Sequence, residues 1–230
     1  MLKADFHIHT SEDAKDSFIK YSAKDIIRKA SKLKFDVIAI TNHKKVTYDK
    51  KLVDYAKKKG ILLIPGIEST IEGNHVLILN ATKDAEKVNT FSKLEVYKKN
   101  NKDALVIAPH PFYPYKSCLH NDFLKHIDLF DGTEFCHYYT EYFNPYNKKA
   151  IKEAKKFNKP LIGTSDVHRL YQFNKTYSLI DADKNTNSVL DALRKNKIKI
   201  KTKPLSSINC SRVILSMIMY KLLRILKRKV

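Results

Sequence analysis

Short apolar runs alternate with longer amphipathic segments along most of this chain. The runs are rich in valine, isoleucine and leucine, which is typical of strands buried on both faces of a sheet. On this pattern we predict strands at residues 2–9, 35–41, 61–67, 75–79, 105–108, 129–135, 161–164 and 198–202.

The segments between these runs have helical spacing. Ser22 and Asp25 form a short capping box, and Ile26, Ile27 and Ala30 follow on one helical face. Further helices are predicted around residues 49–59, 84–100, 148–157 and 188–195. This repeat of strand and helix predicts a parallel sheet, and a compact α/β barrel over residues 1–205 is the natural architecture. We see no linker and no second domain.

The end of the chain differs from this repeat. Residues 206–230 crowd isoleucine, leucine and methionine among lysines and arginines, which predicts a basic amphipathic helix. The run is too short and too charged to span a bilayer. We expect it to pack on the barrel, to lie on an anionic membrane surface or to mediate self-association.

Cysteine and glycine usage excludes several classes of protein. The three cysteines are odd in number and form no C-x-x-C pair, which argues against a disulfide framework and a thiolate zinc site. The five glycines form neither a dinucleotide-binding nor a P-loop motif. Because the motif at Asp5–His9 already uses the N-terminus, we expect no cleavable signal peptide and a cytoplasmic protein, peripheral at a membrane if the C-terminal helix binds lipid.

The charge balance predicts anionic ligands. The formal net charge is +20 at pH 7, and it comes mostly from lysines spread along the whole chain. Such a charge favours phosphate esters, nucleic acid or anionic lipid as partners. Many of these lysines are simply the solvated faces of helices.

Histidines and carboxylates gather where the predicted strands end. An H-x-H or D-x-H pair on a strand places both side chains on one face, so each pair can hold one ion. A parallel sheet brings the carboxyl ends of its strands together, where α/β proteins place their active sites. We therefore predict a metal site from His7, His9, His43, Glu68, His110, Asp166 and His168.

In order along the chain, these motifs resemble the PHP family, named for polymerase and histidinol phosphatase proteins. The resemblance rests on DFHIHT at 5–10, AITNH at 39–43, PGIE at 65–68, APHP at 108–111 and GTSDVH at 163–168. It implies a distorted (β/α)7 TIM-like barrel with two or three metal ions at the carboxyl face of the strands. Many family members hydrolyse phosphate esters.

The resemblance also implies roles for individual residues. His7, His9 and Asp166 match ligands of a first metal, Glu68 a carboxylate that bridges to a second, and His110 a ligand of the second. His43, His168 and Asp13 match a third site. The family commonly has Asp where this chain has Asn42, and we expect that residue only to orient its neighbour.

The second metal needs one more donor, for which His75 and His137 are the candidates. His75 opens a strand seven residues after Glu68, whereas His137 follows the strand that holds Glu134. We expect Glu134 to support a ligand rather than bind metal, and His120 and His126, in a predicted helix, to be structural.

Nitrogen and oxygen donors without thiolate suit Zn, Mn or Fe. The expected function is therefore metal-dependent hydrolysis of a phosphorylated small molecule, nucleotide or oligonucleotide, with a metal-bridging hydroxide as nucleophile. Glu68, Asp166 and His168 are the expected catalytic residues, and Arg169 and Lys44 the expected phosphate contacts, because each basic residue follows a candidate ligand. The alternatives are a metal-dependent amidohydrolase and a nucleic-acid-binding module with structural metals.

Overall fold

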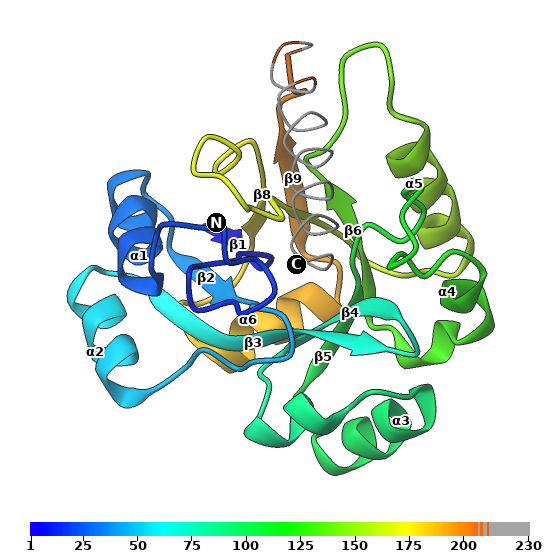
Figure 1. Ribbon diagram of the computed structural model, residues 1–230, viewed down its shortest axis with the longest axis horizontal. Coiled ribbons are helices and arrows are strands. Elements are labelled where there is room, and N and C mark those ends of the chain that lie inside the picture. The colour runs from blue at the N-terminus through cyan, green and yellow to red at the C-terminus, as the bar shows by residue number, and fades with distance from the viewer. Residues whose placement is uncertain (207, 209–210, 212–230) are drawn as a thin grey trace, which may run out of the picture.

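A single nine-stranded sheet curls into a nearly closed barrel in the computed structural model, which describes residues 1–206, 208 and 211 (Figure 1). The strand order is β7-β6-β5-β4-β3-β2-β1-β8-β9. The strands are β1 (Leu2–Asp5), β2 (Val37–Ile40), β3 (Leu62–Ile71), β4 (Asn74–Leu79), β5 (Leu105–Ala108), β6 (Gly132–Cys136), β7 (Leu161–Thr164), β8 (Thr176–Ile180) and β9 (Ile198–Thr202). The expectation of a distorted α/β barrel is confirmed.

Helices cover the outside of this sheet. The longer ones are α1 (Ala23–Lys32), α2 (Lys50–Lys58), α3 (Phe91–Asn100), α5 (Pro145–Lys156) and α6 (Thr186–Arg194), and the shorter are η1 (Lys83–Lys87), α4 (Asn121–Lys125) and η2 (Ile127–Leu129). The capping box at Ser22 and Asp25 is present. The helix predicted around 84–100 is instead a 3-10 turn followed by α3. His120 and His126 flank α4 as its cap residues.

The prediction of a wholly parallel sheet is wrong at two strands. β4 runs antiparallel to both β3 and β5, and β8, which the hydrophobic pattern did not reveal, runs antiparallel to β1 and β9. Only Glu72 and Gly73 separate β3 from β4, with φ of 49° and 90°. A two-residue turn with positive φ makes a hairpin, whereas parallel neighbours need a long crossover.

The barrel closes between its first and last parallel strands. Toward the carboxyl ends of the strands, Ile8 and Val167 pair directly in parallel, just beyond the ends of β1 and β7. Toward the other end of the barrel, β8 fills the gap. There the Ser178 hydroxyl accepts from the amide of Gly163 and donates to its carbonyl oxygen, both at 3.0 Å. This closure brings the segments after β1 and β7 side by side.

Apolar side chains fill the barrel and leave one end for polar groups. The inward cluster includes Phe6, Ala39, Ile64 and Leu77, and Leu190 of α6 packs against it from the other end (Figure 1). Separate clusters on the outer face pack α1 and α2, or α3 and α4, against the strands. With α6 against the lower end of the core, the polar cleft opens at the carboxyl ends of the strands.

The C-terminal segment is tested only in small part. The amphipathic helix expected over 206–230 lies almost entirely outside the described residues. Among those that the structure describes, none belongs to a helix long and apolar enough to cross a membrane.

Gly163→Ala should destabilise the fold, because its backbone forms the barrel seam. An added Cβ would lie 2.7 Å from Ile200 Cγ2 and 3.1 Å from the backbone oxygen of Tyr177. We expect a loss of about 1–3 kcal/mol in the free energy of unfolding, the range for overpacked cores, measured by denaturant titration. Gly132→Ala is the comparison variant and should lose less stability, since its Cβ would lie 3.0 Å from the flexible tip of Ile162 and 3.2 Å from the backbone oxygen of Pro160. Equal stability of the Gly163 variant and the parent would contradict this role.

Candidate metal centre

Strand periodicity explains why ionisable side chains meet above the apolar core. On β3, Glu68 is in phase with Ile64, which belongs to the inward cluster, and on β4, His75 is in phase with Leu77. Because β4 is antiparallel to β3, its first residues lie beside the last residues of β3, at the carboxyl face. The reversed strand therefore delivers His75 to the same face as the parallel strands.

The first donor cluster consists of His7, His9, Glu68 and Asp166. The Nε2 atoms of His7 and His9 lie 3.1 Å apart, and Asp166 Oδ1 lies 3.2 Å and 3.4 Å from them. Each carboxylate oxygen of Glu68 lies 3.4 Å from one of these nitrogens. Four ligands at about 2.1 Å from a tetrahedral ion would lie about 3.4 Å apart, so these spacings fit a metal.

The second cluster shares Glu68 with the first. Glu68 Oε1 lies 2.9 Å from His75 Nδ1 and 3.4 Å from His110 Nε2. Of the two histidines left open by the sequence, His75 is thus in a donor cluster, whereas His137 is in none of the clusters that the described residues form. Glu68 thus stands between the two clusters.

A third cluster forms beside the first and includes a residue that the sequence analysis missed. Asp13 Oδ2 lies 3.0 Å from His9 Nδ1 and 2.8 Å from His43 Nδ1. Asp16 Oδ2 lies 3.3 Å from the same His43 nitrogen and 3.0 Å from His168 Nε2. Asp16 therefore links His168 to Asp13 and His43. Its position three residues after Asp13 in the loop that follows His9 is the signal that could have revealed it.

Some buried oxygens of these clusters lack a hydrogen-bond donor. Among the described residues, Glu68 Oε1 and Asp166 Oδ1 have no partner with hydrogen-bond geometry, although imidazole nitrogens lie close to both. Leaving such buried charged atoms unpaired is costly. A metal ion satisfies them without a proton, so the donor set fits divalent metals.

The pKa values of groups in the cleft also indicate a need for bound positive charge. Burial opposes the ionisation of Glu68, yet the imidazoles of His75, His43 and His7 hold its pKa well below the usual value. Burial also disfavours a charged His43, but Glu68, Asp13 and Asp16 raise its pKa to about 11. The carboxylates thus draw positive charge into the cleft, and bound cations would take over that role from the imidazolium groups.

Groups behind the donors fix their orientation. Glu134 lies in the middle of β6, where Oε1 accepts from His7 Nδ1 at 2.8 Å and from the hydroxyl of Thr164, and Oε2 accepts from the His110 amide at 2.6 Å. Because Glu134 binds Nδ1, the Nε2 atom of His7 is left for the cluster. Glu134 therefore lies where a supporting residue would, as expected.

The backbone is strained at two candidate ligands. His110 and Asp166 have φ of 29° and 42°, values unusual for residues other than glycine. Such strain is commonly found at functional sites, where the surrounding structure holds it in place.

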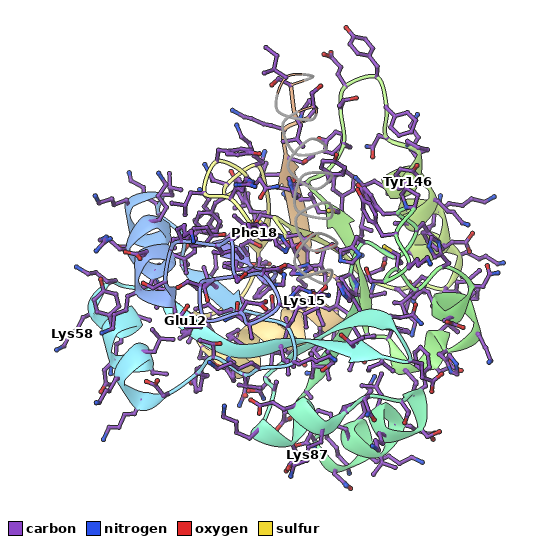
Figure 2. All side chains as sticks on the ribbon, viewed as in Figure 1. Glu12, Lys15, Phe18, Lys58, Lys87 and Tyr146 are labelled. Atoms are coloured by element: carbon purple, nitrogen blue, oxygen red, sulfur yellow. The ribbon has the colours of Figure 1, made fainter. Side chains whose placement is uncertain are left out.

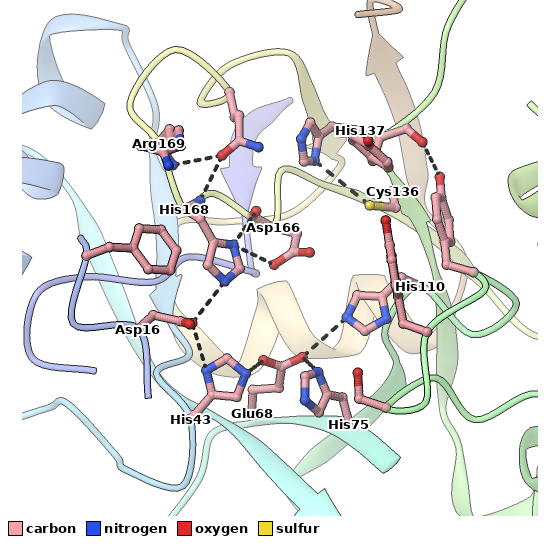
Figure 3. Close-up of a pocket in the computed structure, with 16 residues that line it drawn as sticks. Asp16, His43, Glu68, His75, His110, Cys136, His137, Asp166, His168 and Arg169 are labelled. Atoms are coloured by element: carbon pink, nitrogen blue, oxygen red, sulfur yellow. Dashed lines mark hydrogen bonds and ion pairs between the residues drawn. The ribbon is translucent and has the colours of Figure 1, made fainter. Parts of the chain in front are cut away.

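A cleft of about 360 Å³ opens beside the three clusters (Figure 3). Arg169 lines it, with the guanidinium carbon 5.3 Å from the Phe18 ring centroid. Gln172 Oε1 accepts from the amides of His168 and Arg169 at 3.0 Å and 2.7 Å, and so holds both residues. Other lining side chains are Tyr113, Tyr115, Ser117, His137 and Tyr138.

Lys44, the other expected phosphate contact, is exposed and does not line this cleft. Its backbone has φ of 54° and donates to Glu68 O at 3.0 Å, which forms part of the turn after β2. Lys15, which the sequence analysis did not single out, lies near the centre of the view in Figure 2, and its Nζ is 2.8 Å from His75 Nε2.

Comparison with solved structures supports the fold. A two-domain protein from Bacteroides vulgatus, described as containing a predicted PHP-like metal-dependent phosphoesterase, superimposes with a TM-score of 0.68 at 21% identity, over 87% of this chain and 64% of that protein. PsfC from Pseudomonas syringae superimposes with a TM-score of 0.62 at 14% identity, over 96% of this chain and 98% of PsfC. At such identities the likeness establishes architecture alone.

Comparison of sequences identifies the family. An uncharacterized protein of Methanocaldococcus jannaschii, MJ1587, is 28% identical over 165 residues, which cover 69% of this chain and 91% of that protein. The model of the PHP-associated region matches residues 144–198. The PHP domain model matches residues 5–145, more than half of the chain and every cluster donor except Asp166 and His168. The chain therefore belongs to the PHP domain family.

Proposed function

We propose that this protein is a metal-dependent hydrolase of phosphate esters. The observation that carries the proposal is Glu68, which is 1% exposed and stands between two donor clusters at the floor of a cleft. Paired metal sites that share a carboxylate are suited to phosphoryl transfer. His7, His9 and Asp166 would hold one ion with Glu68, His75 and His110 a second, and Asp13, Asp16, His43 and His168 a third.

Divalent ions bound there, of which Zn, Mn and Fe suit these donors, would lower the pKa of an attacking water and neutralise charge on phosphoryl oxygens. Within the chain, Glu68 and Asp166 supply the negative charge that retains the cations. Asp16 and the backbone oxygen of Asp166 hold His168 against the cleft, through its two ring nitrogens. Because of these positions, we propose Glu68, Asp166 and His168 as the catalytic residues.

Arg169 provides the second support for phosphate esters. Gln172 fixes its backbone, and the Phe18 ring lies beneath its guanidinium group. A guanidinium can hold two phosphoryl oxygens through parallel hydrogen bonds, which an amide substrate would not require. Arg169 therefore favours phosphate esters over amides. The cleft volume suits a phosphorylated small molecule or one nucleotide unit.

The protein purified without chelator should contain two to three equivalents of a divalent transition metal. Glu68 connects the first cluster to the second and His9 connects the first to the third, and together the carboxylates of the clusters need more positive charge than one ion brings. Elemental analysis measures this directly. Less than one equivalent, even after reconstitution with Zn, Mn or Fe, would contradict the proposal.

Glu68→Gln should abolish hydrolysis of an aryl phosphate and lower the metal content, while the circular dichroism spectrum stays native. An amide keeps the shape of the side chain but removes the charge shared by two clusters. Glu141→Gln, at an exposed position in the loop after β6, is the matched control and should keep parental activity. Activity retained in the Glu68 variant would remove this residue from the metal centre.

Arg169→Ala should lower kcat/KM by about ten- to a hundredfold, the effect of losing a charge-assisted hydrogen bond of about 1.5–3 kcal/mol. Arg169→Lys should recover only part, because lysine lacks the planar fork. Metal content should stay at the parental level in both. Arg28→Ala, an exposed arginine on α1, is the control. If Arg169→Ala is as active as the parent, Arg169 does not contact the phosphate.

A further inference from the structure

His137 lies in the cleft but outside the metal centre. It follows β6 directly, is 2% exposed and lines the cleft with Tyr138 and His110. In Figure 3 it lies on the side opposite Glu68 and His75. None of the described donor clusters includes it, and neither the proposed mechanism nor the barrel core uses it.

One nitrogen of this ring has nothing to bind. Among the described residues, His137 Nε2 has no hydrogen-bond partner, although it is buried. A buried nitrogen without a partner lowers the stability of the fold, because it has lost its hydrogen bonds to water. A substrate atom in the open cleft beside the metal centre would supply the missing hydrogen bond.

The other nitrogen indicates which tautomer is present. Nδ1 lies 3.9 Å from the sulfur of Cys136. Burial raises the pKa of the Cys136 thiol well above its usual value, so the sulfur keeps its proton and can donate to Nδ1. In the tautomer whose Nδ1 accepts from this thiol, Nε2 carries the ring hydrogen and is a donor.

The ring stays neutral while it donates. Burial lowers the pKa of His137 to about 4, against the opposing charges of Asp166 and Glu134. A neutral imidazole adds direction but no charge. It therefore complements Arg169 and the cation-binding clusters, which attract phosphate by charge.

We propose that His137 is a substrate-contacting residue whose Nε2–H donates to a non-bridging phosphoryl oxygen, on the side of the cleft opposite Glu68. This inference rests on the proposed function, because it takes a phosphoryl group as the occupant of the cleft. It assigns His137 to substrate recognition rather than to the second metal.

Binding of inorganic phosphate to the metal-loaded protein tests this contact without turnover. Isothermal titration should show about three- to tenfold weaker phosphate binding in His137→Phe, as expected for one neutral hydrogen bond. His137→Gln, which keeps a donor, should recover part of that loss. Metal content should match the parent in both variants. The exposed His120, replaced by glutamine, is the matched control and should change neither quantity.

Two outcomes would overturn the assignment. Phosphate affinity unchanged in His137→Phe would show that the ring does not contact phosphate, and metal loss in both variants would make His137 a ligand. If the phenylalanine variant does not fold, the ¹⁵N resonance of His137 Nε2 in the parent should move on adding phosphate, and a static resonance would refute the contact.

Hydrolysis is measured separately, with an aryl phosphate. A parent that hydrolyses it but binds phosphate independently of His137 would leave the proposed function standing and refute this contact. A parent that binds phosphate through His137 without hydrolysing any ester would support this contact and refute the proposed function.

Discussion

The crowding of carboxylates around buried imidazoles at one end of a barrel is the constraint on which this structure depends. Glu68 is almost wholly buried and lies within 3.4 Å of ring nitrogens from His7, His9, His75 and His110. An apolar core alone would not tolerate this arrangement, because ionised groups out of water need compensating charge. The sheet curvature, the strained strand ends and the reversed strand β4 all bring donors from distant parts of the chain to one place.

Much of the architecture was predictable because buried parallel strands leave a simple hydrophobic pattern. The elements that escaped prediction lack that pattern for physical reasons. β8 turns Thr176, Ser178 and Ile180 to the buried side, and the Ser178 hydroxyl satisfies the backbone of Gly163, so two of its three inward positions are polar. The direction of β4 has no hydrophobic signature, since strand periodicity is the same in either direction. Only the turn at Glu72 and Gly73 records the reversal.

The residues of the candidate site also differ in how well the sequence could predict them. Residues at strand ends, such as His7 and His110, were predictable because a parallel sheet collects those ends. Asp16 comes from an irregular loop, and its approach to His43 and His168 depends on how that loop folds. Lys44 is adjacent to His43 in sequence but outside the cleft, because the turn in which it lies has positive φ. Sequence adjacency to a ligand placed Arg169 on the cleft but not Lys44, so it is a less reliable guide than the position of a strand end.

Gln172 has a consequence for how enzymes with this barrel diversify. A single side-chain oxygen accepts the backbone amides of both His168 and Arg169. The backbones of a candidate metal ligand and of the proposed phosphate contact are thereby held by one side chain, so a change at Gln172 would disturb both. New specificities would arise more readily on the opposite wall, where Tyr113, Tyr115 and Tyr138 line the cleft outside the donor clusters. The fold thus separates a wall that carries His168 and Arg169 from a wall lined by tyrosines.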